Sequence, residues 1–414
     1  MSFSDSTTRP NAVKISGLVE LYKTSLQSRG YEPGATHAYK RAVEHFIAWS
    51  APGSDYVEIG EVLIRRFLDE HLGNCNCSGR QQRGKVTSLS ALRHLQAILR
   101  ATGGIPPAPP SFQSFVISEL QAYCDHARDV CGLAPATLIS RSKWIGRFLT
   151  HAFPTGGLEF SRLRPKGIRD FFAAQCQGFE PGSAQVVASS VRSYLRFRAL
   201  RHADPVEALM ASIPTVAHWP LAALPEYLNL EELAKLMSAF DQKEPQSQRD
   251  YAIIRCLVDL GLRSCEVAAL HLNDIDWKTG TLNIRGGKSH RVDVLPLPAD
   301  TGRAIAYYLH NGRPAIESRA VFVRHRAPLD VPIDAGVIRS VVRQAAARSG
   351  LAGRLHGPHQ LRHSAATFML QGGATLKEIA DVLRHRSLDT TAIYAKVDFP
   401  RLSAIAQPWP GGAA

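Results

Sequence analysis

The stretch HGPHQLRHSAATFML, residues 356–370, places basic side chains at the start of an otherwise apolar helix. Pro358 favours a helix start, because its fixed φ suits the first turn and its missing N–H is not needed there. His359 and Arg362 are three residues apart and therefore share one face of this helix. A lone histidine is more often a satisfied polar residue than a catalyst. These two residues therefore indicate a site only if other residues accompany them.

Further polar and charged residues lie at the ends of other apolar helices and at one turn. Each is weak evidence alone, since an arginine at a helix end usually makes an ion pair or a dipole contact. In chain order they are Arg263 and Glu266 in GLRSCEVAAL (261–270), Lys288 in GTLNIRGGKSHRVDVLPL (280–297), and His385 and Tyr394 in RHRSLDTTAIYAKVD (384–398).

This set of residue types suits phosphoryl transfer through a covalent intermediate. A tyrosine hydroxyl has a pKa of about 10, and dense positive charge favours its ionised, nucleophilic form. Two arginines can clamp the non-bridging oxygens of a phosphodiester, and removing one such donor typically costs about 3–4 kcal/mol. Lysine suits protonation of the leaving 5′ oxygen, and histidines hydrogen-bond phosphate and move protons. Arginine supplies the positive charge here, so we expect no metal and no cofactor.

Size and charge agree with a nucleic-acid enzyme. The 414 residues suffice for two or three domains. A net charge of +13 indicates a polyanionic partner, although a generally basic proteome would also produce it. The seven cysteines are scattered and form no disulfide framework, and no signal sequence or membrane-spanning run is present. We therefore expect a cytoplasmic protein with no membrane partner.

Two proline-rich stretches, 101–111 and 213–227, predict linkers, because proline cannot continue a helix. The fold class that we predict is mainly α with a small antiparallel sheet. The expected domains are an N-terminal helical domain (1–105), a second helical domain (112–212), the linker 213–227, an α+β catalytic domain (228–400) and a C-terminal tail (401–414).

The first two domains resemble each other, which we interpret as a duplication. The alternative is that any two amphipathic helical bundles share such patterns. Three pairs of segments match in the same order: 29–49 with 131–151, 64–71 with 168–175, and 90–100 with 189–201.

The third domain mixes helical and strand periods. Alternation around Gly286 and Gly287 predicts a β-hairpin, and AVFV (320–323) predicts a third short strand. Asn229 with Glu232, and Thr375 with Glu378, predict capping boxes at two helix starts.

The motifs quoted above resemble those of the tyrosine recombinases, or phage integrase family, over about residues 228–400. Residues 112–212 are similar to the family's SAM-like, core-binding helical domain, and residues 1–105 match only through their likeness to that second domain. The resemblance implies a DNA breaking-rejoining catalytic domain. It also implies that Tyr394 attacks the phosphate and leaves a 3′-phosphotyrosyl link, that Arg263 and Arg362 hold the phosphate and that Lys288 is the general acid. His359 and His385 would support phosphate binding and proton transfer, and Glu266 would brace the site.

The resemblance further implies the partner and the assembly. The partner is double-stranded DNA, and a homo-tetramer on two DNA sites exchanges strands through a Holliday junction, without ATP. The tail 401–414 would dock on a neighbouring protomer. We expect a bacterial, nucleoid-associated integrase or transposase-like enzyme of a mobile genetic element, with sister recombinases or accessory proteins as further partners. The alternatives are a type IB topoisomerase and a non-catalytic DNA-binding protein.

Three features remain less specific. Arg384 lies where the family often has glycine, and it would contact phosphate or point outward. Cys75 and Cys77 lie near His71, but zinc sites usually need two such pairs and Cys-x-Cys is a tight spacing, so we expect no metal site. Basic residues mixed with aromatics on two helices are candidates for DNA backbone contacts, with a solvated helix face as the alternative; they are Lys143, Arg147, Arg192, Arg196 and Arg198.

Overall fold

The computed structural model describes residues 11–77, 82–107, 112–154, 157–202, 204, 206–215, 224–285, 292–329, 331–385, 387 and 390–397. Within these residues the chain is mainly helical with two small antiparallel sheets, which confirms the predicted fold class. The chain divides into two compact units, Met1–Pro107 with Leu224–Ala414 and Ala108–Ala223. None of the described helices has the length and apolarity needed to cross a membrane.

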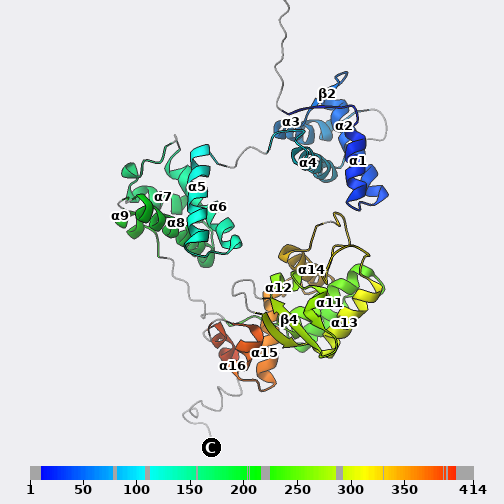
Figure 1. Cartoon of the computed structure of the whole chain (residues 1–414), viewed down its shortest axis with the longest axis vertical. Helices are drawn as coiled ribbons and strands as arrows, with labels where there is room; N and C mark the ends of the chain where they lie inside the picture. Colours follow the sequence, from blue (N-terminus) through cyan, green and yellow to red (C-terminus); the bar gives the residue numbers. More distant parts are fainter. Residues whose placement is uncertain are drawn as a thin grey trace, which may run out of the picture. The chain divides into compact units, whose positions relative to one another are not determined.

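Residues 11–107 form a first helical region, coloured blue in Figure 1, around its own hydrophobic core. Tyr22, Phe46 and Phe67 are fully buried at its centre. A two-stranded sheet that the sequence did not predict joins two loops of this region. The elements are β1 (Ala12–Lys14), α1 (Leu18–Ser28), α2 (Pro33–Ser50), β2 (Tyr56–Glu58), α3 (Glu61–Arg66), the π-helical turn η1 (Phe67–His71), the 3₁₀ turn η2 (Leu72–Asn74) and α4 (Lys85–Ala101).

Residues 112–215 form a second helical region with a separate core. Phe148, Phe171 and Tyr194 are fully buried there. Its elements are α5 (Ser114–Asp129), α6 (Pro135–Ala152), the 3₁₀ turn η3 (Phe160–Arg162), α7 (Pro165–Cys176), α8 (Pro181–His202) and α9 (Glu207–Ala211).

The two helical regions share details of their construction. Helices α2 and α6 both begin with proline and both contain 18 residues. The rings of Phe46 and Phe67 meet edge to face with centroids 5.3 Å apart, and those of Phe148 and Phe171 meet edge to face at the same 5.3 Å. These likenesses favour the duplication, which stays a prediction.

Residues 224–397 form the third region, which holds most of the candidate site. Its main core is built by α11, α13, α14 and the sheet, and a smaller core joins α15, α16 and η6. The elements are α10 (Leu230–Ser238), α11 (Pro245–Asp259), α12 (Ser264–Ala268), η4 (Leu272–Asp274), β3 (Ile275–Asp276), β4 (Thr281–Arg285), β5 (Val292–Pro296), α13 (Ala299–Asn311), α14 (Ala335–Arg348), α15 (Pro358–Gln371), α16 (Leu376–Leu383) and η6 (Ala392–Val397).

The sheet of the third region contains the predicted hairpin, with β4 paired antiparallel to β5. Leu282 lies opposite Leu295, and both side chains face the core. The prediction of a strand at 320–323 is wrong, because only Ala320 forms a bridge, with His271. The third strand is β3, which pairs with β4.

Both predicted capping boxes are confirmed. The side chain of Asn229 accepts from the Glu232 N–H at 2.8 Å, and Glu232 accepts from the Asn229 N–H at 2.9 Å. Thr375 and Glu378 form the same pair of hydrogen bonds at the start of α16. These bonds satisfy backbone donors that a helix start otherwise leaves unpaired. Helix α16 thereby has a defined start, and it ends just before Arg384 and His385.

Candidate active site

Most of the candidate residues of the third region lie in one group, where hydrogen bonds connect the start of α12, the first turns of α15 and the end of α16. These residues come from the ends of helices. Arg263 directly precedes α12, His359 and Arg362 lie in the first turns of α15, and Arg384 and His385 directly follow α16. We call the group the arginine cluster; it consists of Arg263, Glu266, His359, Arg362, Arg384 and His385.

Arg263 forms the exposed edge of the arginine cluster and is held there by the buried Glu266. The Arg263 backbone N–H and Nη1 both donate to the Glu266 carboxylate, at 2.8 and 2.7 Å. The Arg263 Nη2 donates to the Arg384 carbonyl oxygen at 3.2 Å. The Arg263 side chain nevertheless stays 43% exposed. Glu266 therefore holds the guanidinium in place while part of it still faces solvent.

Arg362 is the buried member of the arginine cluster, at 2% exposure. Its guanidinium donates to the carbonyl oxygens of Gly261 and Leu383. Burial, followed by the charges of Arg263 and Arg384, lowers the pKa of Arg362 to about 10, so it remains charged at neutral pH. Gly261 has φ 57°, and a Cβ there would lie 2.5 Å from Leu383 Cδ2. Glycine is therefore required where the chain passes beneath Arg362.

The two histidines predicted for the site are mostly neutral at pH 7. His359 is exposed, yet partial desolvation of its ring, with the charges of Arg362 and Arg263, lowers its pKa. His385 Nδ1 lies 2.7 Å from Thr391 Oγ1. Burial and the same arginines lower the pKa of His385 to about 4. Both rings can therefore donate and accept hydrogen bonds without adding positive charge.

Tyr394 is buried beside the arginine cluster, at 1% exposure. Its ring packs in the small core with Leu370 and Leu383. Its hydroxyl lies 2.9 Å from His363 Nδ1, and the tautomer of the ring decides which group donates. Burial raises the pKa of Tyr394 to about 12, although the charge of Arg362 acts to lower it. The hydroxyl is thus protonated and shielded from solvent in this structure.

Arg384 differs from what the sequence analysis expected. Its guanidinium points inward, with a side-chain exposure of 7%, and donates to Glu266 at 2.8 Å and to the Val382 carbonyl oxygen at 2.6 Å. The backbone of Arg384 has φ 55°, a left-handed conformation that favours glycine. Burial by itself raises the pKa of Glu266, but Arg384 and Arg263 outweigh it and keep that pKa low. Arg384 therefore neither points outward nor reaches toward a ligand, but holds Glu266.

His363 is a site residue that the sequence analysis missed. His363 follows His359 by one helical turn, and their ring centroids are 4.4 Å apart. The spacing of four residues on one helix face is the signal that could have identified it.

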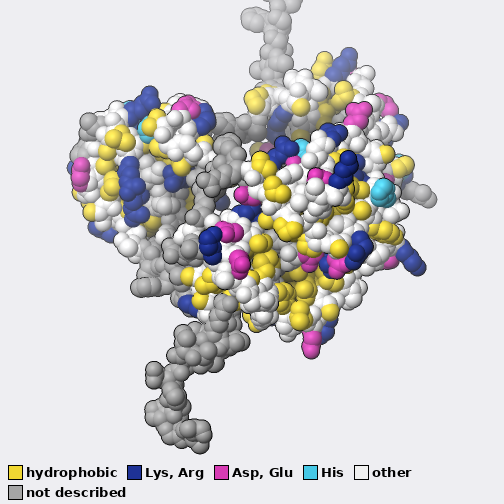
Figure 2. Space-filling view, turned by 60° about the horizontal axis from the view of Figure 1, so that its bottom comes forward, with side chains coloured by type: hydrophobic (Ala, Val, Ile, Leu, Met, Phe, Trp, Pro, Cys, Tyr) yellow, Lys and Arg dark blue, Asp and Glu magenta, His cyan; other side chains and the backbone are white. Residues whose placement is uncertain are grey.

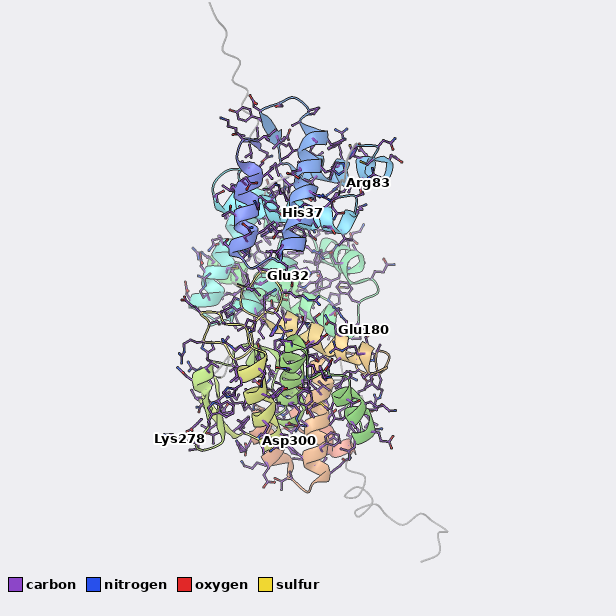
Figure 3. The ribbon with its side chains drawn as sticks, turned by 90° about the vertical axis from the view of Figure 1, so that its right-hand side faces the viewer. Glu32, His37, Arg83, Glu180, Lys278 and Asp300 are labelled. Carbon is purple, nitrogen blue, oxygen red and sulfur yellow. The ribbon has the colours of Figure 1, made fainter. Side chains whose placement is uncertain are left out.

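Lys288, the predicted general acid, lies outside the described residues. In the sequence it falls between the end of β4 at Arg285 and the start of β5 at Val292. The lysine of the neighbouring turn, Lys278, lies between β3 and β4 and so belongs to the other end of β4. Figure 3 shows Lys278 at the outer edge of this region.

The predicted DNA-contact residues of the second region fall into two classes. Lys143 and Arg147 are exposed, and each lies with its charged group 4.9 Å from the centroid of the Trp144 ring. Arg196 is exposed and Arg192 is half-buried. Figure 2 shows Lys and Arg side chains beside hydrophobic ones on this region, at the left of the view. These four residues are placed where a polyanion could reach them.

Arg198 belongs to the other class, and its prediction as a DNA contact is corrected by the structure. Its side chain is 9% exposed and pairs with Glu119 at 3.1 Å and with Asp204 at 2.7 Å. Tyr194 donates to the same Glu119 carboxylate at 2.7 Å. The guanidinium is thus already compensated inside the core, where removal of one partner would leave a buried charge.

The charges of the arginine cluster suit an anion with several oxygen atoms. Three guanidinium groups, from Arg263, Arg362 and Arg384, accompany the single carboxylate of Glu266. Guanidinium groups present several N–H donors in a planar fork that matches phosphate geometry. The hydroxyl of Tyr394 lies close enough to this site for the charge of Arg362 to act on its pKa.

Comparisons with known proteins agree with this chemistry. Residues 226–401 match the phage integrase family. The chain is 40% identical over 392 residues to y4rA of Sinorhizobium fredii, which is named as an integrase/recombinase, and the match covers 94% of this chain and 93% of the relative. It is 28% identical over 311 residues to the tyrosine recombinase XerD of Mycobacterium tuberculosis, over 71% of this chain and 96% of XerD.

A solved structure shows the same fold. The XerH site-specific recombinase, bound to a palindromic difH substrate in a post-cleavage complex, superimposes with a TM-score of 0.57 over 84% of this chain and 95% of that chain, at 21% identity. The extent of the y4rA match, and the position of the arginine cluster within the matched segment, lead to one conclusion. This chain belongs to the phage integrase family of tyrosine recombinases.

Proposed function

We propose that the chain is a site-specific DNA recombinase that cleaves and rejoins DNA at the arginine cluster, with Tyr394 as the nucleophile. The observation that carries this proposal is the position of a tyrosine hydroxyl close to the charged, buried Arg362, which itself lies near the exposed Arg263. The family match covers the same segment.

In the proposed reaction, the Tyr394 oxygen bonds to the scissile phosphorus as the bond from phosphorus to the 5′ oxygen breaks. The tyrosine proton leaves to a nearby base; the contact of its hydroxyl with His363 Nδ1, at 2.9 Å, belongs to the buried state and is lost when η6 moves. The leaving 5′ oxygen takes a proton from Lys288. The product is a 3′-phosphotyrosyl link with a free 5′ hydroxyl, and attack by another 5′ hydroxyl reverses the step on a new strand.

Arg263 and Arg362 divide the work of holding the phosphate. Arg263 has donors facing solvent and can bind the non-bridging oxygens directly. Arg362 lies deeper, and its positive charge stabilises the negative charge that grows on the phosphate in the transition state. His359 and His385 hydrogen-bond the phosphate as neutral rings. Glu266 braces Arg263, and Arg384 braces Glu266.

Burial of Tyr394 implies a conformational step before the reaction. At 1% exposure the hydroxyl cannot approach a phosphate in solution, so η6 must move away from the small core of α15 and α16. DNA binding or contact with a neighbouring protomer would favour the exposed state if either binds it more tightly.

The proposed assembly is a homo-tetramer on two DNA sites that exchanges strands through a Holliday junction. The second region would contact the DNA backbone through Lys143, Arg147, Arg192 and Arg196. The tail 401–414, outside the described residues, would dock on a neighbouring protomer. We assign the enzyme to a mobile genetic element, with action in the bacterial cytoplasm on the nucleoid and with sister recombinases or accessory proteins as further partners.

The proposal is tested by trapping the covalent intermediate. The full-length chain is incubated with DNA from its native locus that carries a nick beside the cleavage position. After denaturation, the amount of protein that remains attached to the DNA is measured. We expect a covalent complex from the wild-type chain and none from Tyr394→Phe. The matched control is Tyr308→Phe, because Tyr308 is also fully buried in this region and its hydroxyl also contacts a histidine, His325, at 3.2 Å.

The outcomes separate the proposal from its rivals. Attachment at one discrete sequence supports a site-specific recombinase, whereas attachment at scattered sites would indicate a type IB topoisomerase. Equal attachment by Tyr394→Phe would exclude Tyr394 as the nucleophile. If the nicked DNA traps no complex even with the partner proteins present, the chain is a non-catalytic DNA-binding protein.

A further inference from the structure

Two histidines and two cysteines of the first helical region bring their ligand atoms together. They are His45 on α2, His71 at the end of η1, and Cys75 and Cys77 just after η2. One ligand atom from each lies within 4.8 Å of the others. We call this group the ligand cluster. The sequence analysis considered three of the four and missed His45, which lies 26 residues before His71 (71 − 45 = 26).

The distances within the ligand cluster suit a tetrahedral metal ion. His45 Nε2 lies 3.1 Å from His71 Nε2 and 3.2 Å from Cys75 Sγ, and Cys77 Sγ lies 3.5 Å from His71 Nε2. Zinc bonds nitrogen at about 2.0–2.1 Å and sulfur at about 2.3 Å, so tetrahedral angles place two nitrogens about 3.3 Å apart and nitrogen and sulfur about 3.6 Å apart. These three separations lie within about 0.4 Å of the tetrahedral values.

The tautomer of His45 can be assigned from the contacts of its ring. The Nδ1 of His45 lies 3.1 Å from the Gln82 carbonyl oxygen, which can only accept, so Nδ1 carries the ring proton. In the neutral ring, Nε2 therefore has one lone pair, and this lone pair faces both His71 and Cys75. A single cation can engage all four ligand atoms at once.

The surroundings hold the ligands as they are held in known metal sites. Metal-bound histidines usually donate their second ring N–H to a carbonyl or carboxylate, as His45 does to Gln82. The His71 ring stacks on Trp49 and on Phe67, with centroids 5.4 Å away in each case. His45 is fully buried and Cys75 is 8% exposed. The imidazole rings thus have fixed orientations.

The backbone also adapts to the ligand cluster. Residues 67–71 form a π-helical turn between α3 and η2, and such wide turns occur often at functional sites. Arg83, labelled in Figure 3, donates to the Cys77 carbonyl oxygen at 3.5 Å. The chain is therefore held both before and after the cysteine pair.

We propose that His45, His71, Cys75 and Cys77 bind one zinc ion, which ties the segment after η2 to helix α2. Two sulfur and two nitrogen ligands in a tetrahedron are the donor set that zinc prefers. All four positions are filled by protein side chains, so the ion has a structural role, separate from the reaction at the arginine cluster. Binding requires both cysteines as thiolates, and their protons are released to solvent.

The test begins with the metal content of the full-length chain, purified without chelators or a metal-affinity step. Elemental analysis should find about one zinc per chain in the wild type. In the double variant Cys75→Ser with Cys77→Ser we expect at least a tenfold loss. The matched control is Cys131→Ser with Cys176→Ser, which removes two thiols from the second region and should keep the full zinc content.

A second measurement uses the wild-type chain and so does not depend on the folding of a variant. Replacement of the bound ion by Co²⁺ should produce the intense visible absorption of a tetrahedral site together with thiolate-to-cobalt charge transfer. Alkylation of Cys75 and Cys77 should be slow until a chelator is added, whereas alkylation of the exposed Cys131 should not respond to the chelator.

Several results would overturn the proposal. The first is less than a tenth of an equivalent of zinc in a wild-type chain that also fails to take up Co²⁺. The second is iron or copper bound in place of zinc. The third is full zinc content in the cysteine double variant. None of these results depends on whether Tyr394 cleaves DNA.

Discussion

The ligand cluster and the arginine cluster both contain histidines, but their neighbours differ in charge. In the ligand cluster, two imidazoles and two thiols point their lone pairs at one another. In the arginine cluster, three guanidinium groups surround one carboxylate and the neutral His359 and His385. Lone pairs that converge suit a cation, whereas N–H donors and positive charge suit an anion. The charge of the neighbouring groups therefore decides whether a histidine serves a cation site or an anion site.

The largest effect is expected when the anion site alone is weakened. We expect Arg263→Lys to lower the rate of covalent complex formation by about 10²–10³, because one ammonium cannot replace a planar fork of donors on the phosphate. Zinc content should stay at the wild-type value. Arg354→Lys is the matched control, since Arg354 also pairs with a glutamate and its side chain is 44% exposed, against 43% for Arg263. Equal rates for both variants would remove Arg263 from the site.

The cation site is weakened by His45→Gln, whose effect should depend on zinc. With zinc bound we expect the melting temperature of the first region to fall by about 10 °C or more, because a metal in large excess over its Kd contributes about 3–4 kcal/mol. After chelation, wild type and variant should melt within a few degrees of each other. His363→Gln is the contrast, because its effect should be the same with and without chelator. A zinc-independent effect of His45→Gln would contradict the metal assignment.

The third prediction concerns Arg384, which supports the anion site from behind. Arg384→Met keeps much of the buried volume but leaves the Glu266 carboxylate with one fewer cationic partner. We expect covalent complex formation to fall about tenfold, a loss of about 1.4 kcal/mol, with partial rescue in Arg384→Lys. The pKa of Glu266 should rise in the methionine variant. On acidification, the activity of this variant should therefore begin to decline at a higher pH than the activity of the wild type. Unchanged rates and pH profile would show that Arg263 needs no such support.

The smallest expected effect is on the pH dependence of stability without DNA. Burial lowers the pKa of both His363 and His385 to about 4, whereas an unfolded histidine titrates near 6.5. Between these values the unfolded chain binds more protons than the folded chain, so stability should fall as pH is lowered from about 6.5 to 4. Thermal melts across this window should show a shallower slope for His363→Asn. His310→Asn, at the exposed end of α13, is the control.

The parts of the fold that the sequence predicted are those that depend on residues close together in the chain. The capping boxes at Asn229 and Thr375 and the β4–β5 hairpin depend on residues that are close in the chain, and all three were predicted. The β1–β2 pairing was not, because two three-residue strands over 40 residues apart carry almost no periodic signal.

The residues of the candidate sites likewise divide into those that local motifs identify and those that only tertiary packing brings together. The family motifs identified Arg263, Arg362 and Tyr394 from residue type and order. His45 could not be found this way, because its link to His71 depends on how α2 packs against η1. The direction of the Arg384 side chain depended on a left-handed backbone that a single sequence does not reveal.

The burial of Tyr394 also bears on the safety of the host chromosome. A recombinase with a freely exposed nucleophile could nick any duplex that happened to touch its arginines. Here the hydroxyl is held against His363, behind the ends of α15 and α16, and the hydrophobic contacts of its ring oppose its release. If Tyr394 is the nucleophile, as proposed above, the isolated protomer is latent, and strand breakage waits until assembly on the correct DNA supplies the energy to expose the tyrosine.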